Sequence, residues 1–279
     1  MAKKRRYKAR STTSANLAAE AYEQEADEIV FEEEPSMEGG GLQDNLIMLY
    51  GPPKIGKSKL CHLIPGVYFL PTEPGLSWLK CRKTRIRNWA TFKAFVKKME
   101  RSPKKCKSVK MWCIDTGDNL AKFCMQYACG RAKIAHPSDQ QWGKGWEAFR
   151  DEFTHWILRL GTLGPGIVVV SHETEREIVT HSKTLTKISP ALPKTCYTVL
   201  NNLADIILRM GWKIKKKKTR RGKTKIVAED TETRCLFTRP NNLMDAGDRT
   251  ELLPDVIFFT KESEAVKALM KAFGQKGEE

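Results

Sequence analysis

Leu46-Ile-Met-Leu-Tyr50 leads directly into Gly51-Pro-Pro-Lys-Ile-Gly-Lys-Ser58, and this stretch decides the fold. Its second part matches the pattern GxxxxGK[ST], with a strand-like apolar run before it and a helix-compatible segment after it. In such a loop, backbone N–H groups surround phosphate, the lysine reaches the β- and γ-phosphates, and the hydroxyl contacts Mg²⁺. We therefore expect a P-loop that binds ATP and Mg²⁺. The expected nucleotide contacts are Gly51, Pro52, Pro53, Lys54, Ile55, Gly56, Lys57, Ser58 and Lys59.

A second carboxylate is needed to hold the metal, and the run 109–115 provides one. It reads Val-Lys-Met-Trp-Cys-Ile-Asp, an apolar strand that ends in Asp115, as in a Walker B motif. We therefore predict that Ser58 and Asp115 hold Mg²⁺. Thr116 follows where AAA+ ATPases carry a catalytic glutamate, so the carboxylate that activates water is expected elsewhere.

Glu73 is the first candidate for that carboxylate, because it comes just after the second expected strand, at the sheet edge that faces the γ-phosphate. The alternative is an exposed loop glutamate, with Asp118 in the catalytic role. A further strand ends in Ser171 and His172, which puts a polar side chain where a γ-phosphate sensor would lie. A structural role for His172 is the alternative reading.

Short apolar runs alternate with amphipathic segments from residue 46 onward, and this alternation predicts an α/β fold with a mostly parallel central sheet flanked by helices. The expected core strands are 46–50, 66–70, 109–115, 167–171 and 204–210, and the expected helices are 88–101, 142–160 and 262–273. After Gly211 the chain shifts to short β segments, 212–217, 225–228 and 234–238. We divide the chain into a tail (1–41), an ATPase domain (42–260) that includes a β-hairpin extension (211–239), and a C-terminal helix and tail (261–279).

Charge is distributed unevenly along the chain, whose formal net charge is +16. Residues 1–10 carry six basic groups, residues 11–41 carry nine acidic groups and no basic ones, and residues 42–279 carry 43 basic against 24 acidic groups. The tail therefore reads as disordered, either as a solubilising segment, as a mimic of nucleic acid that covers a basic surface, or as a docking site for another replication protein such as a single-strand-binding protein. The excess of cations in the remaining residues favours a polyanionic partner.

The sequence contains no apolar run near the roughly 18 residues that a membrane span needs, and no signal peptide. Its eight cysteines include no CxxC pair, which favours reduced structural thiols over zinc or disulfides. A cytoplasmic protein without membrane contact is expected.

Nine lysines and arginines with no acidic residue occupy 213–225, around a turn between two β segments. Such a hairpin would be destabilised by repulsion unless a polyanion binds it, so we predict nucleic-acid contact there, against the alternative of a merely solvated charge run. The expected contacts are Lys213, Lys215, Lys216, Lys217, Lys218, Arg220, Arg221, Lys223 and Lys225.

The order of these motifs resembles that of the RecA-like ATPases. More closely, it resembles phage-encoded nucleotide-binding proteins of that superfamily, some of which act as single-strand annealing recombinases. The resemblance covers about residues 45–260, and its local features are Asp115-Thr-Gly-Asp-Asn-Leu120, His136-Pro-Ser-Asp139, Gly143-Lys-Gly-Trp146, Ser171-His-Glu173, Ala191-Leu-Pro-Lys194 and Ala246-Gly-Asp-Arg249. The chain departs from RecA in lacking its N-terminal helix domain and in carrying Pro52-Pro53-Lys54 inside the P-loop.

The resemblance implies a RecA-like P-loop NTPase core, an assembly into rings or filaments, and action on single-stranded DNA. It also implies that the segment after the sensor strand, 173–190, is a DNA-binding loop, with Arg176, His181, Lys183 and Lys187 as candidate contacts. The alternative is a long mobile loop whose charge is incidental. The resemblance further implies that Arg249 acts as an arginine finger in the ATP site of a neighbouring subunit. The alternative is that Arg249 forms a surface salt bridge. A P-loop nucleotide kinase and an ATP-gated loader of a replication protein remain the alternative functions.

Overall fold

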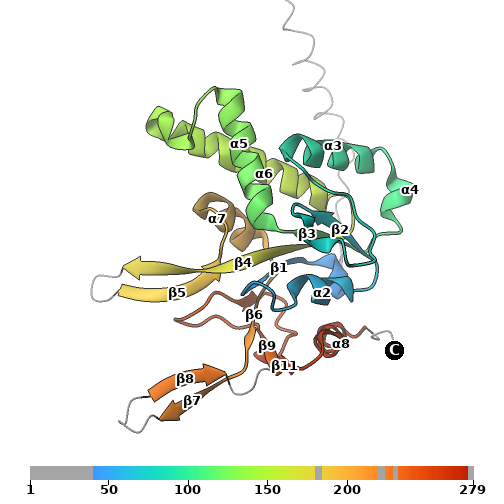
Figure 1. Ribbon diagram of the computed structural model, residues 1–279. Helices are drawn as coiled ribbons and strands as arrows, with labels where there is room; N and C mark the ends of the chain where they lie inside the picture. The colour runs from blue at the N-terminus through green and yellow to red at the C-terminus, as the bar shows by residue number, and fades with distance from the viewer. Residues whose placement is uncertain (1–39, 180–183, 219–223, 229–231, 276–279) are drawn as a thin grey trace, which may run out of the picture. The chain divides into compact units, whose positions relative to one another are not determined.

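In the computed structural model of the chain, residues 40–179, 184–218, 224–228 and 232–275 are described. Strands and helices alternate through the first two thirds of these residues, as the sequence predicted (Figure 1). The strands are β1 (Leu46–Gly51), β2 (Val67–Pro71), β3 (Met111–Asp115), β4 (Gly166–Val179), β5 (Thr184–Pro190), β6 (Ile206–Trp212), β7 (Ile214–Lys218), β8 (Thr224–Ala228), β9 (Arg234–Phe237), β10 (Gly247–Asp248) and β11 (Val256–Phe259). The α-helices are α2 (Lys57–His62), α3 (Trp89–Glu100), α4 (Pro103–Cys106), α5 (Gly117–Ala132), α6 (Lys144–Gly161), α7 (Lys194–Leu203) and α8 (Glu262–Ala272), and the 3-10 helices are η1 (Leu42–Asp44), η2 (Pro74–Leu76), η3 (Pro137–Asp139) and η4 (Gln141–Gly143).

The central sheet runs in the order β11-β9-β6-β1-β4-β3-β2. The five strands from β6 to β2 are parallel, and β9 and β11 add antiparallel pairs at one edge. β4 lies between the P-loop strand β1 and the Walker B strand β3. The expected α/β fold with a mostly parallel sheet is therefore confirmed.

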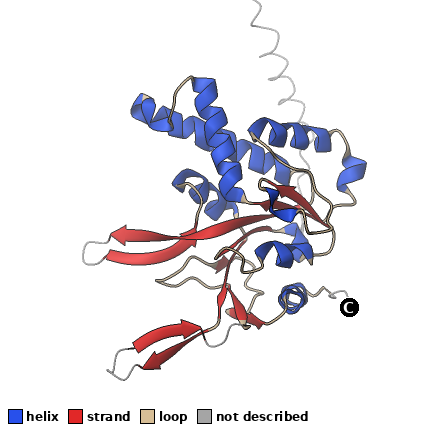
Figure 2. Cartoon of the chain, viewed as in Figure 1, coloured by secondary structure: helices blue, strands red, loops and turns tan. Residues whose placement is uncertain are grey.

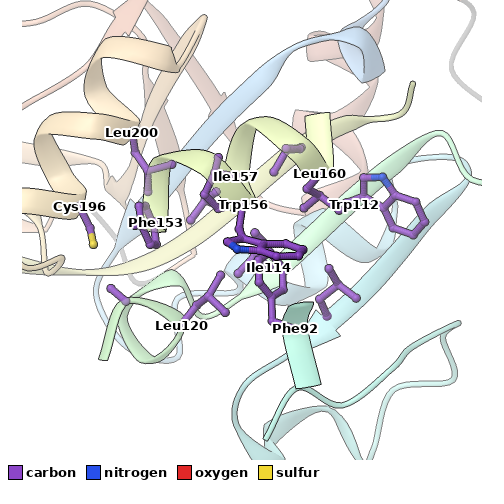
Figure 3. Close-up of a cluster of buried hydrophobic side chains, with 14 of the residues drawn as sticks. Phe92, Trp112, Ile114, Leu120, Phe153, Trp156, Ile157, Leu160, Cys196 and Leu200 are labelled. Carbon is purple, nitrogen blue, oxygen red and sulfur yellow. The ribbon is translucent and has the colours of Figure 1, made fainter. Parts of the chain in front are cut away.

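Both faces of this sheet are buried, which explains the continuous apolar runs of its strands. Along β1, Met48 and Tyr50 belong to the hydrophobic cluster under α3, α5, α6 and α7, while Ile47 and Leu49 belong to the cluster under α2 and α8. Figure 2 shows the helices on the two sides of the strands, and Figure 3 shows the first cluster around Phe92, Trp112 and Trp156. The two-residue alternation of strand side chains thus places β1 at the centre of the core.

Helix α3 confirms the expected amphipathic segment after the second strand. Its N-cap is Asn88, whose side chain accepts a hydrogen bond from the Thr91 N–H at 2.8 Å. Such a cap satisfies a backbone donor that would otherwise be unpaired. The expected helix 142–160 begins later, at Lys144, because Trp142 and Gly143 have φ angles of 61° and 71° and form part of a separate 3-10 turn.

The segment after the fourth core strand is not the loop that the resemblance implied. β4 continues without interruption from residue 166 to residue 179 and pairs in antiparallel register with β5. The two form a long hairpin that extends beyond the parallel sheet (Figure 1). Its backbone groups are therefore paired where a loop would leave them to solvent.

The expected basic hairpin is confirmed as the antiparallel pair β7–β8, which forms a two-stranded sheet of its own. β9 differs from the expectation, because it belongs to the central sheet and not to the hairpin extension. Helix α8 buries Ala265, Val266, Leu269 and Met270 in the same cluster as β1 and β6, so it packs into the core of the domain.

The eight cysteines are free thiols, and all except Cys81 are buried. Within the described residues, no helix is both long enough and apolar enough to cross a bilayer.

Candidate functional site

The carboxyl ends of the parallel strands bring the predicted motifs together. In the strand register, Gly51 at the start of the P-loop is opposite His172, and Asp115 is opposite both Pro71 and Val170. Glu73 follows two residues after Pro71. The edge where α/β proteins hold their ligands thus carries four of the sequence-predicted motifs.

The P-loop has a backbone conformation that depends on glycine at two positions. Gly51 has φ 156°, and a Cβ built on it would lie 2.2 Å from the Met210 carbonyl oxygen of β6. Gly56 has φ 108°, and a Cβ there would lie 2.7 Å from Glu262 Oε1. Both glycines are therefore required by close approach as well as by their φ angles.

Replacing Gly51 with alanine is expected to lower the free energy of unfolding by about 1–3 kcal/mol, because the added methyl group overpacks against the β6 backbone. Urea denaturation of the ligand-free protein measures this change. Gly130→Ala is the control: Gly130 lies in α5 with open space around its Cβ position, and this variant is expected to gain about 0.5–1 kcal/mol. Equal effects at the two glycines would contradict the packing described for the P-loop.

Lys57 lies under the loop with 6% of its surface exposed. Its Nζ donates hydrogen bonds to the carbonyl oxygens of Gly51 and Pro52, both at 2.8 Å. Burial lowers the pKa of Lys57, and the neighbouring carboxylates of Asp115 and Asp118 partly offset this effect. The ammonium group is thus held inside the loop by acceptors that carry no full charge.

Asp115 ends β3 beside the first turn of α2 and is 8% exposed. Burial raises the pKa of this carboxyl group, and the negative charge of Glu73 raises it further. The Ser58 hydroxyl acts in the opposite direction by hydrogen bonding to it. A buried carboxylate and a hydroxyl side by side, with a second carboxylate nearby, match the oxygen ligands that Mg²⁺ prefers, so this site fits the metal.

Glu73 and Asp118 occupy different environments. Glu73 Oε1 accepts hydrogen bonds from Thr116 Oγ1 and Asn119 Nδ2, both at 2.9 Å, and in the described part of the chain its Oε2 has no such partner. Asp118 uses both oxygens: Oδ1 accepts from the Ser171 hydroxyl, and Oδ2 accepts from the backbone N–H and the Nδ1 of His172. Asp118 therefore orients His172, while Glu73 keeps an oxygen available.

A cavity of about 700 Å³ joins these groups, and its walls include Lys57, Ser58, Glu73, Asp115 and His172. The side chains in its walls that were not predicted include Trp78, which is 66% exposed, Arg234 and Glu262. Nothing in the local sequence marks the last two, because Arg234 is 179 positions from the P-loop residue Ile55 that it contacts. Trp78 follows Glu73 by five residues. An aromatic residue this soon after the second strand is the sequence feature that could have indicated its place in the cavity.

Arg249 lies at the amino-terminal ends of the parallel strands, opposite to the P-loop. Its N–H donates to the Asp205 carbonyl and its side chain to the Asn202 carbonyl, and the Asp205 carboxylate in turn accepts from the N–H of Leu46, the first residue of β1. The P-loop is at the opposite end of β1. Arg249 is therefore not part of the cavity in its own chain.

Two of the predicted DNA contacts are engaged inside the domain. Arg176 donates to the carbonyl oxygens of Pro190 and Leu192 and lies over the ring of Tyr197, and Lys187 Nζ forms an ion pair with Asp245 at 2.6 Å. These bonds fasten the β4–β5 hairpin to the rest of the fold. His181, Lys183, Arg220, Arg221 and Lys223 lie outside the described residues.

The other predicted contacts are in or next to the basic hairpin. Lys215, Lys216, Lys217 and Lys218 are in β7, Lys225 is in β8, and Lys213 joins β6 to β7 with its Nζ over the ring of Phe258. The strand register puts Lys217 opposite Lys225. Like charges in opposite positions destabilise a hairpin that has no anionic ligand.

The family model of the AAA domain matches residues 43–250. The SPbeta prophage-derived uncharacterized protein YorG of Bacillus subtilis (strain 168) is 27% identical over 149 residues, which are 52% of this chain and 46% of that protein. This chain thus spans about half the length of that curated relative. A crystal structure of the RadB recombinase matches 80% of this chain and 90% of its own with 14% identity and a TM-score of 0.43, a likeness too distant to bear on the site. Since the family match covers most of the sequence, the chain belongs to the AAA domain family of nucleotide-binding P-loop ATPases.

Proposed function

We propose that this chain is a Mg²⁺-dependent ATPase that acts on single-stranded DNA in the recombination, replication or repair of phage DNA. The observation that carries the ATPase part is the convergence of Lys57, Ser58, Asp115, Glu73 and His172 on one cavity. The phage setting is supported by the prophage origin in the name of the Bacillus relative.

Each group in the cavity has a role in hydrolysis that follows from its surroundings. Lys57 and the loop N–H groups hold the phosphates, and a phosphate supplies the negative charge that the carbonyl partners of Lys57 lack. Ser58 and Asp115 would hold Mg²⁺, which would neutralise the negative charge that develops on the phosphate during hydrolysis. Trp78, at the wall of the cavity, offers an aromatic face to the adenine base.

Glu73 is the residue that orients and deprotonates the attacking water, because its side chain lines the cavity and its Oε2 has no hydrogen-bond partner among the described residues. His172 contacts the γ-phosphate end of the nucleotide, and Asp118 fixes its orientation through Nδ1. In this proposal Asp118 is a positioning residue for His172, and Glu73 is the catalytic carboxylate.

The nucleic-acid part of the proposal is supported by the basic hairpin β7–β8. Its lysines contact phosphates, so binding is independent of sequence and weakens with salt. We also propose assembly into a ring or filament in the cytoplasm, where Arg249 reaches a neighbouring subunit from the exposed surface. The tail 1–41 recruits another replication protein in this proposal.

The test is ATP hydrolysis by the full chain with and without single-stranded DNA, at low and high salt. We expect stimulation by DNA that falls as salt rises, since each phosphate contact in single strands contributes about 0.7 to the slope of log K against log salt. Absence of stimulation at low salt would refute the DNA part. Phosphate transfer from ATP to a nucleoside would favour a kinase, and function that survives Lys57→Ala but not deletion of residues 1–41 would favour an adaptor or loader.

A further inference from the structure

Arg234, the first residue of β9, lies in the wall of the nucleotide cavity and contacts the P-loop. Its Nη1 donates to the carbonyl oxygen of Ile55 at 2.9 Å and to Glu262 Oε1 at 2.7 Å, and its Nη2 donates to the carbonyl oxygen of Thr260. The Arg234 side chain is only 12% exposed. One guanidinium group therefore links β9, α8 and the loop that surrounds phosphate.

The same cluster reaches the helix that follows the P-loop. Glu262, with a side chain that is 6% exposed, also pairs with Lys59 of α2 at 3.0 Å. Gly56 is packed so closely against this pair that a Cβ would lie 2.8 Å from Arg234 Nη1. A displacement of this ion pair would therefore change the packing around Gly56, which precedes the phosphate-binding Lys57.

Arg234 also lies at the base of the basic hairpin. In the register of β6 and β9, Arg234 is opposite Trp212, and the next pair outward is bonded through the N–H of Lys213 and the carbonyl of Thr233 at 3.0 Å. β7 begins at the following residue, Ile214. A hydrogen-bonded strand pair thus connects the hairpin to the residue whose side chain contacts the P-loop.

We propose that Arg234 is a positioning residue through which nucleic acid on the hairpin changes the affinity of the P-loop for ATP. This proposal rests on the proposed ATPase and DNA-binding function and specifies how its two sites communicate. Binding of a polyanion relieves the repulsion between the hairpin lysines and fixes the hairpin, which fixes β9 and the Arg234 contacts with Ile55 and Glu262. A loop held in one conformation loses less entropy when ATP binds, so ATP binds more tightly.

An arginine is suited to this position because its planar guanidinium group donates hydrogen bonds to several acceptors in fixed directions. The three acceptors come from a loop carbonyl, a carbonyl that precedes α8, and a carboxylate in α8. A lysine keeps the charge beside Glu262 but concentrates its donors on one nitrogen. Arg234→Lys therefore removes the simultaneous hydrogen bonds to the three acceptors and keeps the positive charge.

The experiment measures the ATP dissociation constant with and without single-stranded DNA for the wild type and for Arg234→Lys, both as full chains. Coupling of this kind typically changes affinity 5- to 150-fold. In the wild type we expect DNA to tighten ATP binding about tenfold, and ATP to tighten DNA binding by the same factor. In Arg234→Lys we expect this factor to approach one, ATP binding to be weaker about tenfold, and DNA affinity in the absence of ATP to be unchanged.

The control is Arg239→Lys, near the other end of β9. Arg239 also bonds a carboxylate, that of Asp255, and two carbonyl oxygens, those of Asp248 and Leu253, but it does not contact the P-loop. We expect this variant to retain the full coupling factor. Loss of coupling in both variants would mean that a weakened sheet is responsible, and the proposal would be overturned.

Hydrogen exchange on the wild type tests the proposal without any substitution. DNA is expected to slow exchange of the amides in residues 55–59, and unchanged exchange there overturns the proposal. If DNA stimulates hydrolysis but Arg234→Lys retains the coupling, only the role of Arg234 is refuted. If the wild type does not bind DNA, the proposed function fails together with this one.

Discussion

Replacing Glu73 with glutamine is expected to lower the turnover number for ATP by about 10²- to 10⁴-fold, the contribution of a positioned general base. ATP affinity should change little, because a glutamine Oε1 can still accept the hydrogen bonds from Thr116 and Asn119. The substitution replaces Oε2, which has no hydrogen-bond partner among the described residues, with an amide nitrogen. Single-turnover hydrolysis together with a binding titration separates the two quantities.

The control for this variant is Glu147→Gln, which removes an exposed carboxylate of α6 whose contact with Arg150 is 3.6 Å long. It should hydrolyse ATP at the wild-type rate. Asp118→Asn provides the comparison with the rival carboxylate: it disturbs the orientation of His172 and is expected to cost less than Glu73→Gln. A Glu73→Gln enzyme with normal turnover, and an inactive Asp118→Asn enzyme, would reverse the two roles.

The parallel core was predictable because its determinants are local in the sequence. The run 46–58 contains a strand buried on both faces and the glycines that its loop needs, and Asp115 and His172 follow apolar runs of the same kind. Parallel pairing then places all strand ends at one edge. For this reason Glu73, Asp115 and His172 were expected together and share the wall of one cavity.

The remaining features depend on contacts between distant residues, which periodicity does not reveal. β4 continues as a strand past His172 because β5 supplies its hydrogen bonds, whereas the resemblance implied a loop there. The same holds for Arg234, whose partners Ile55 and Glu262 come from opposite ends of the domain. Position 249 carries the arginine that an arginine finger needs. The pairing of β10 with the start of β6, however, puts Arg249 at the end of the parallel strands opposite to the P-loop.

Changing Lys215, Lys216, Lys217 and Lys218 of β7 together to glutamine is expected to weaken binding of single-stranded DNA on the order of 10²- to 10³-fold at about 0.1 M salt. The estimate assumes that each lysine neutralises one phosphate and releases about 0.7 counterion, so the slope of log K against log salt should also fall by about 3. Fluorescence anisotropy of a labelled oligonucleotide over a range of salt concentrations measures both quantities. ATP hydrolysis without DNA should persist, because the P-loop cavity includes no residue of β7.

A matched variant shows whether the position of the charges matters or only their number. Lys104, Lys105, Lys107 and Lys110 are exposed around α4, before the amino end of β3, and their replacement by glutamine lowers the net charge by the same amount. If DNA is held by the hairpin, this variant should keep most of its affinity and most of its salt dependence. Equal losses in the two variants would mean that DNA responds to the net charge of the protein, and the hairpin would lose its assignment as the binding surface. A loss confined to the β7 variant, accompanied by loss of DNA-stimulated hydrolysis, connects the basic hairpin to the ATPase site in the central sheet.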